Sequence, residues 1–157
     1  MNTQNKILSS ESLATRLHDL ARPLVFTNGC FDILHRGHTT YLEQARNLGE
    51  ALIVGVNSDA SVKRQNKGSD RPINTLQDRL SVLASLECVD AVVSFDEDTP
   101  LNLIMQILPD HLVKGGDWHV NDIVGADIVR QNSGNVHSLA FEFDRSTTSL
   151  INRIRDN

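Results

Sequence analysis

Two histidines separated by two residues are the side chains in this sequence with the clearest capacity for chemistry. His35 and His38 stand in the segment NGCFDILHRGH, which begins one residue after the apolar run LVF. An imidazole can hydrogen-bond a phosphate oxygen, transfer a proton or bind a metal ion. A zinc site would need a third ligand, for which Asp32 and Cys30 are available, but no HExxH or CxxC pattern accompanies the pair. A phosphate-binding pair and ordinary turn residues therefore remain the two main interpretations.

The histidines belong to a turn between a predicted strand and a predicted helix. The run LVFTN is typical of a buried strand, and the helix is expected from about residue 38 to residue 48, where Gly49 ends it. In an open α/β sheet, ligands bind at the carboxyl ends of strands, and a helix N-terminus offers free N–H groups to an anion. Gly29 and Gly37 would let the backbone approach a phosphate closely. The turn therefore predicts an anion site.

Apolar runs alternate with helix-like segments along the whole chain, and this order predicts the fold class. Buried strands are expected at LVFTN, ALIVGVN, VDAVVSF, HLVKGG and VHSLAFEF, and helices over residues 11–21, after Thr75, after Thr99–Pro100 and over residues 146–155. Continuous apolar strands indicate a sheet covered by helices on both faces. We therefore predict a single α/β domain over residues 1–157 with a doubly wound, mainly parallel sheet. Its N-terminal helix would fall within residues 1–22 and its catalytic core within residues 23–155.

Charge and composition restrict the possible function classes. The net charge of -5 argues against a general nucleic-acid binder, which needs a clustered excess of Lys and Arg. Cys30 and Cys88 are too few for a disulfide framework or a four-thiolate zinc site. The first ten residues have no apolar core of a signal peptide, and no later run approaches the roughly 20 apolar residues of a membrane span. We expect a cytoplasmic protein with neither nucleic acid nor membrane as a partner.

A basic, turn-rich segment follows the second predicted strand. It reads SDASVKRQNKGSDRPIN and has little apolar surface, so we expect residues 63–71 to be mobile without ligand and to close over phosphates. Lys67 is the first candidate for the cation that neutralises phosphate, with Lys63 and Arg64 as competitors. Each could instead be a solvated surface charge. Arg79 follows the segment and either faces the phosphates or lies exposed on a helix.

The segment GCFDILHRGH resembles the signature of the HxGH nucleotidyltransferases, a Rossmann-like group that includes cytidylyltransferases and pantetheine-phosphate adenylyltransferase. Walker A, GxGxxG and GxSxG patterns are absent. Further blocks resemble the branch that adenylylates a heptose 1-phosphate: VNSDASVKR, RPIN, QDR, VVSFDEDTP, ILPDHLVKGGDW and STTSLI. The resemblance covers about residues 23–155. It implies transfer of AMP from ATP, with Mg²⁺, to a sugar 1-phosphate, and a homo-oligomer such as a dimer.

The resemblance also implies roles for individual residues. His35, His38 and Lys67 would stabilise charge on the triphosphate, without a metal bound by the protein itself. The nucleotide would contact Cys30, Phe31, Gly37, Lys114, Gly115, Asp117, Ser146, Thr147 and Thr148, and the acceptor would contact Asp32, Asp98, Lys63 and Arg64.

Several of these positions keep a structural alternative. The Gly115–Gly116 pair can serve only a turn, Ser146 can be a simple helix cap, and Asp98 can be a plain helix-entry residue. Trp118 can be core, although a pocket position is favoured. Related cytidylyltransferases carry Arg and Gly ahead of the STT triplet, whereas Asp144–Arg145 stand here, which leaves the loop shape open and makes Arg145 a candidate for the missing cation.

The implied reaction needs no general base, because a phosphate nucleophile is already ionised at pH 7. Orientation and charge stabilisation are the tasks left to the protein. Two other functions stay open. One is a cytidylyltransferase acting on glycerol 3-phosphate or a similar alcohol phosphate. The other is a non-catalytic nucleotide-binding regulatory subunit, against which the intact HxGH motif and the loop lysines weigh.

Overall fold

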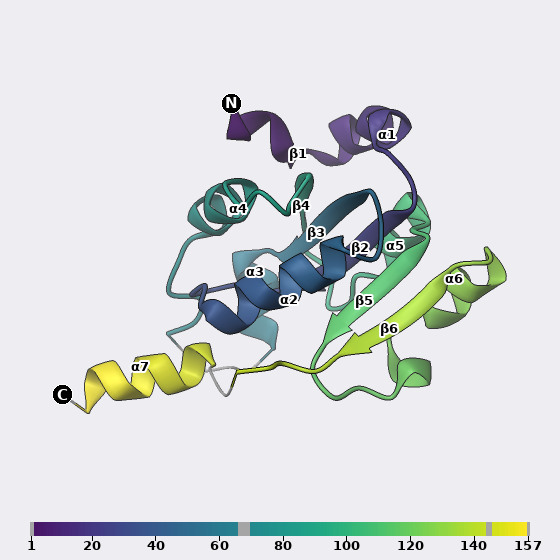
Figure 1. Ribbon diagram of the computed structural model, residues 1–157. Helices are drawn as coiled ribbons and strands as arrows, with labels where there is room; N and C mark the ends of the chain where they lie inside the picture. The colour runs from purple at the N-terminus through teal and green to yellow at the C-terminus, as the bar shows by residue number, and fades with distance from the viewer. Residues whose placement is uncertain (1, 66–69, 144–145, 157) are drawn as a thin grey trace.

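A six-stranded parallel sheet forms the centre of the protein (Figure 1). The computed structural model describes residues 2–65, 70–143 and 146–156. The strand order is β1-β4-β3-β2-β5-β6, and every neighbouring pair runs parallel. The strands are β1 (Ile7–Leu8), β2 (Leu24–Gly29), β3 (Ala51–Asn57), β4 (Ala91–Phe95), β5 (His111–Gly115) and β6 (Asn135–Leu139). The predicted class, a Rossmann-like α/β fold with a parallel sheet, is therefore confirmed.

Helices cover both faces of this sheet. They are α1 (Ser10–Asp19), α2 (Arg36–Arg46), α3 (Asp59–Arg64), α4 (Leu76–Ala84), α5 (Leu101–Ile107), α6 (Ala126–Gln131) and α7 (Thr147–Arg155), with short 3-10 turns η1 (Thr3–Lys6) and η2 (Val120–Asp122). Alternate strand residues point to opposite faces. Phe26 and Ile53 accordingly pack with α1 and α5, whereas Val25 and Leu52 pack with α2 and α4. Burial on both faces explains the continuous apolar runs.

The order of the strands creates a switch point beside β2. From β2 the chain moves outward through β3 and β4 on one side, and β5 and β6 lie on the other side. In such sheets, the crevice at the carboxyl ends of the two strands flanking the switch point is where ligands bind. Here those ends are Asn28–Gly29 of β2 and Lys114–Gly115 of β5.

Some predicted boundaries were wrong, each for a local reason. The first helix covers Ser10–Asp19 rather than residues 11–21, with Ser9 as its N-cap, and α5 begins at Leu101 with Pro100 as its N-cap. Strand β6 stops at Leu139, four residues before the end of the apolar run. Helices α3 and α6 and the two-residue strand β1 were not predicted, because they are too short to show a periodic pattern.

Helix α7 stands apart from the rest of the fold. It projects from the body at the lower left of Figure 1, and none of its residues is buried. Thr147 Oγ1 donates to the Ile33 carbonyl (3.2 Å), and the Arg155 guanidinium pairs with Asp70. The described part of the chain contains no helix with the length and apolar character needed to cross a membrane.

Truncating Ile53 tests the packing of the central strand. Its side chain is fully buried, so Ile53→Ala should lower the free energy of unfolding by about 2–5 kcal/mol. Urea denaturation followed by circular dichroism measures this. Ile73 is 48% exposed, and the matched variant Ile73→Ala should change stability by no more than about 0.5 kcal/mol. Equal losses in the two variants would contradict the described core.

Candidate functional site

Three cavities meet at the carboxyl ends of β2, β3 and β5, and Cys30 lines all of them. The amide cavity, of about 200 Å³, is named for Asn28, Asn57 and Gln65 in its lining. The histidine cavity, of about 410 Å³, is lined by His35, His38 and residues 146–148. The glycine cavity, of about 250 Å³, lies between them and is lined by Gly115. The site is therefore a continuous series of compartments at the switch point.

The two histidines form a stacked pair in the histidine cavity. Their ring centroids lie 3.9 Å apart with an interplanar angle of 27°. Burial, with a smaller contribution from the neighbouring His35, lowers the pKa of His38 to about 4, and burial also lowers the pKa of His35. Both imidazoles are therefore neutral at pH 7 in the free protein.

The Nδ1 atoms of both histidines are buried, and within the described residues neither has a hydrogen-bond partner. A buried polar atom without a partner is costly, so each of these two atoms requires an explanation. The position of the pair beside the histidine cavity is compatible with a ligand-binding role, and the choice between that role and ordinary turn residues stays a prediction.

The glycines of the first turn make room for side chains. A Cβ atom at Gly37 would lie 3.0 Å from the His35 ring, and one at Gly29 would lie 3.0 Å from the Phe31 ring. Gly37 is buried within helix α2, which begins at Arg36, two residues earlier than predicted. Its observed contribution is to let His35 fold back onto the helix and stack on His38.

The last helix brings the STT triplet to the histidines from more than a hundred residues away. Ser146, Thr147 and Thr148 line the same cavity as His35 and His38. The Ser146 hydroxyl accepts from the Ser149 N–H (3.0 Å), so Ser146 is also the N-cap of α7. The predicted phosphate position and the structural alternative are therefore both compatible with the geometry.

Asp32 is committed to protein contacts. Its carboxylate is buried and accepts from Arg71 Nε (2.5 Å) and from the backbone N–H groups of Ile73 (2.9 Å) and Asn74 (2.9 Å). Burial alone would raise the pKa of Asp32, but these donors outweigh it and hold the pKa below its usual value. This arrangement does not support the expected contact between Asp32 and the acceptor. It instead holds residues 71–74 against the turn that contains Asp32.

The predicted basic loop is partly helical. Lys63 and Arg64 belong to α3, and Arg71 is buried against Asp32, so the expectation of one mobile segment over residues 63–71 was wrong at both ends. Lys67 lies outside the described residues, as does Arg145. Arg64 Nε pairs with Asp98 Oδ1 at 2.7 Å on the rim of the amide cavity. Two of the four residues predicted to contact the acceptor, Arg64 and Asp98, therefore pair with each other in the free protein.

Arg79 meets neither of its two predicted roles. It is 2% exposed, so it is no surface arginine, and its donors are used by the protein. It donates to the carbonyls of Cys30 (2.7 Å) and Asn57 (2.8 Å) and to the Asp59 carboxylate (2.7 Å). The guanidinium thus joins the turns that follow β2 and β3.

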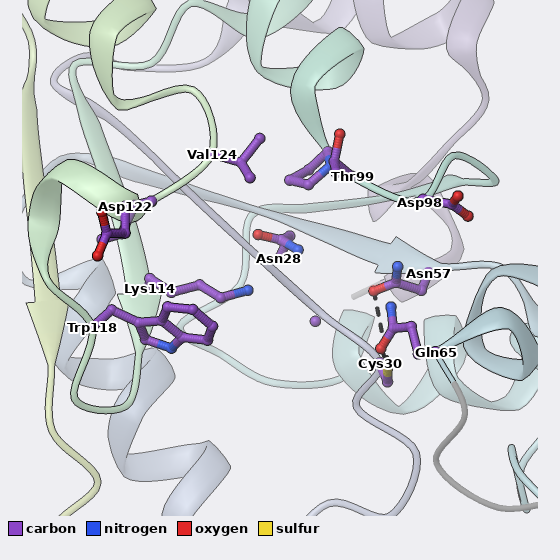
Figure 2. Close-up of a pocket in the computed structure, with 13 residues that line it drawn as sticks. Asn28, Cys30, Asn57, Gln65, Asp98, Thr99, Lys114, Trp118, Asp122 and Val124 are labelled. Carbon is purple, nitrogen blue, oxygen red and sulfur yellow. Dashed lines mark hydrogen bonds between the residues drawn. The ribbon is translucent and has the colours of Figure 1, made fainter.

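The end of β5 separates the amide cavity from the glycine cavity. Lys114 and Trp118 line both of them, and Figure 2 shows the two side chains together at one wall of the amide cavity, opposite Asp98 and Asn57. Gly116 has a φ of +106°, a backbone conformation that glycine adopts more readily than other residues, so it serves the turn after β5. Asp117 is exposed and lies outside the linings of the three cavities.

Sequence reasoning missed several lining residues. They are Asn28, Asn57, Gln65, Asp122 and Phe141. Asn28 and Asn57 stand at the ends of predicted strands, where the switch-point rule would have identified them as candidates. Asp122 ends the short 3-10 turn η2 and Phe141 follows the end of β6, and neither position has a comparable signal in the sequence.

Comparison with known proteins gives consistent similarities. A family model described as "Cytidylyltransferase-like" matches residues 26–153. A Bordetella bronchiseptica protein named "D-beta-D-heptose 1-phosphate adenylyltransferase" is 53% identical over 154 residues, which cover 97% of this chain and 95% of that protein. An Azotobacter vinelandii "Bifunctional protein HldE" is 53% identical over 98% of this chain. The chain spans 33% of that longer relative.

Solved structures show the same fold. A Thermoplasma volcanium structure described as "lipopolysaccharide core biosynthesis protein" aligns with a TM-score of 0.61 at 28% identity, covering 77% of this chain and 98% of that one. A pantoate-beta-alanine ligase from Francisella tularensis also aligns with a TM-score of 0.61, covering 90% of this chain and 68% of that one. At 14% identity, this second likeness concerns the fold alone.

The lowered pKa of His38 predicts a pH-dependent stability. The unfolded chain binds a proton below pH 6.5, whereas the folded chain resists it down to about pH 4. The contribution of the neutral His38 to the free energy of unfolding is therefore fully present above pH 6.5, and it is lost as the pH drops toward 4. Between pH 7 and pH 5 the loss should be about 1–2 kcal/mol, allowing for partial exposure.

His38→Gln should remove most of this loss in urea denaturation at pH 7 and pH 5. His18→Gln, on the exposed surface of α1, is the matched control and should keep the pH dependence of the original protein. An unchanged pH dependence in His38→Gln would contradict the described burial.

Proposed function

Because the chain belongs to the cytidylyltransferase-like family, we propose that it transfers AMP from ATP to D-glycero-β-D-manno-heptose 1-phosphate, giving ADP-heptose and pyrophosphate. The similarity to the named Bordetella adenylyltransferase, which covers nearly the full length of both chains, supports this acceptor. The observation that carries the proposal is the stacked His35–His38 pair, which shares a cavity with the start of α7 and whose buried Nδ1 atoms have no partner among the residues that the structure describes.

The proposed reaction exchanges one phosphorus–oxygen bond for another. A phosphate oxygen of the sugar 1-phosphate attacks the α-phosphorus of ATP, and the bond from that phosphorus to the bridging oxygen breaks, so that pyrophosphate leaves. The nucleophile is an anion at pH 7 and needs no general base. The protein contributes position and charge stabilisation. This matches a site of imidazoles, amides and hydroxyls.

Each cavity has a place in this proposal. The triphosphate would occupy the histidine cavity, the nucleoside the glycine cavity and the sugar phosphate the amide cavity. The amide cavity suits a sugar, because carboxamides and the Asp98 and Asp122 carboxylates can hydrogen-bond hydroxyl groups. Lys114 lines both the nucleoside and the sugar compartments, where two phosphates would meet. Lys67 keeps its proposed role as the cation that neutralises the triphosphate.

Mg²⁺ is proposed to arrive bound to ATP. Within the described residues, no group of three or more His, Cys, Asp or Glu side chains could hold a metal ion, and Asp32 is occupied by Arg71 and backbone donors. These residues do not form a resident metal cage. Mg²⁺ keeps several waters and commonly binds through nucleotide phosphates, so the magnesium complex of ATP is treated as the substrate.

The remaining partner assignments follow from the substrates. A nucleotide and a sugar phosphate are the expected ligands, with neither nucleic acid nor membrane required. We place the protein in the cytoplasm because the reaction consumes ATP. The homo-oligomer, such as a dimer, rests on the family resemblance and is measurable by sedimentation equilibrium.

A substrate matrix tests the proposed function. Pyrophosphate release should be robust with ATP, Mg²⁺ and the heptose 1-phosphate, and weak when CTP or glycerol 3-phosphate replaces either substrate. Preferred turnover of CTP with glycerol 3-phosphate would make the chain a cytidylyltransferase of alcohol phosphates. Tight nucleotide binding without turnover of any pair would instead indicate a regulatory subunit.

Loss of one histidine should affect turnover more than binding. His38→Ala should lower kcat about a hundredfold, or about 3 kcal/mol, because contacts that strengthen in the transition state act mainly on kcat. The Kd for ATP, measured by calorimetry, should change much less. His18→Ala should behave like the original protein. Near-normal turnover in His38→Ala would return that histidine to the status of a turn residue.

A further inference from the structure

The aromatic residues of this chain are few, and their burial is uneven. The sequence has five Phe, one Tyr and one Trp. Phe26, Phe31, Tyr41 and Phe95 are buried. Phe143 packs its ring on the Arg36 guanidinium (3.8 Å to the ring centroid). Trp118 and Phe141 are 50% and 44% exposed, and both line the glycine cavity. The two most exposed aromatic rings thus face one compartment.

The Phe141 ring is held in place although it is exposed. It makes edge contacts with Tyr41 (5.6 Å between centroids, 64°) and His38 (6.5 Å, 90°). A Cβ atom at Gly115 would lie 2.7 Å from the tip of the Phe141 ring. Gly115 has no positive φ, so its lack of a side chain serves this close approach rather than the turn. The ring is therefore a fixed part of the cavity wall.

The Trp118 ring is fixed from its own side. Its indole N–H donates to the Gly115 carbonyl (3.2 Å), and its backbone N–H donates to Ser138 Oγ (3.0 Å). A Cβ atom at Gly116 would lie 3.3 Å from Trp118 Nε1 and 3.8 Å from Phe141 Cε2. Both rings therefore converge near Gly116.

We propose that Phe141 and Trp118 form the aromatic wall on which the base of the nucleotide stacks, with Phe141 as the main contact. The inference rests on the proposed function, because it takes a nucleoside triphosphate as the substrate. Phe141 and His38 line both the histidine cavity and the glycine cavity. If the triphosphate binds at the histidines, the nucleoside attached to it therefore lies in the adjoining glycine cavity, which the two rings line. Flat bases gain free energy from stacking on fixed aromatic side chains.

Calorimetric titration of the full chain with two probes tests the wall. ATP carries a base, whereas inorganic triphosphate carries only the anionic part. Phe141→Ala should raise the Kd of ATP about tenfold, which is within the range for loss of one stacked base, and should leave the Kd of triphosphate unchanged. Phe141→Tyr keeps the ring and should bind ATP nearly as tightly as the original protein. Trp118→Ala should show a smaller loss confined to ATP.

Phe143→Ala is the matched control, because it removes a ring from the same segment but outside the linings of the three cavities. Its Kd for ATP should match that of the original protein. Far-UV circular dichroism checks folding, and Phe141→Leu, which keeps apolar volume, replaces the alanine variant if that one is unfolded. An unchanged Kd of ATP in the folded Phe141 variant overturns the inference. An equal loss for triphosphate also overturns it, because the ring would then act through His38.

Turnover separates this inference from the proposed function. If the unmodified chain binds ATP through Phe141 but releases no pyrophosphate with the heptose 1-phosphate, the adenylyltransferase proposal fails and the aromatic wall stands. If turnover is robust but Phe141→Ala binds ATP normally, the wall is refuted and the proposed function stands.

Discussion

The buried guanidinium of Arg79 is the interaction on which the shape of the site depends. A buried cation is costly unless its donors are satisfied. Here they bond to the carbonyls of Cys30 and Asn57, the carboxylate of Asp59 and the carbonyl of Asn74 (3.2 Å). The turns after β2 and β3 and the chain before α4 therefore share one anchor. Because Cys30 lines all three cavities, that anchor sets where the compartments meet.

Most of the sheet could be predicted, because strands buried on both faces leave continuous apolar runs such as ALIVGVN. The histidine turn was predictable for a related reason, since it follows such a run directly. Arg79 was not predictable. Its partners at Cys30 and Asn57 are backbone carbonyls 49 and 22 residues away, and a backbone acceptor has no signature in the sequence. The end of β6 was misplaced because Phe141 leaves the apolar run to pack on Gly115.

The charges around the cavities are largely committed to one another. Asp32 holds Arg71, Asp59 holds Arg79 and Asp98 holds Arg64. The pairs of Arg71 and Arg79 are structural, since both arginines are almost fully buried. In the pair of Arg64 and Asp98 both side chains are exposed, and exposed ion pairs contribute little to stability. Residue type alone could not separate these cases. The sequence shows four basic residues in one polar segment, and only their burial distinguishes an anchor from a rim charge.

Helix α7 supplies one wall of the histidine cavity while adding almost nothing to the core. None of its described side chains is fully buried, although Leu150 and Ile151 are partly buried, and its contacts with the body include those of Thr147 and Arg155. Detaching such an element exposes far less apolar surface than unfolding the sheet, so we expect the local opening free energy of this wall to lie below the free energy of global unfolding. Amide hydrogen exchange in α7 would thus report on opening of the cavity independently of the sheet, and a ligand bridging the histidines and Ser146 would slow that exchange through its own binding energy.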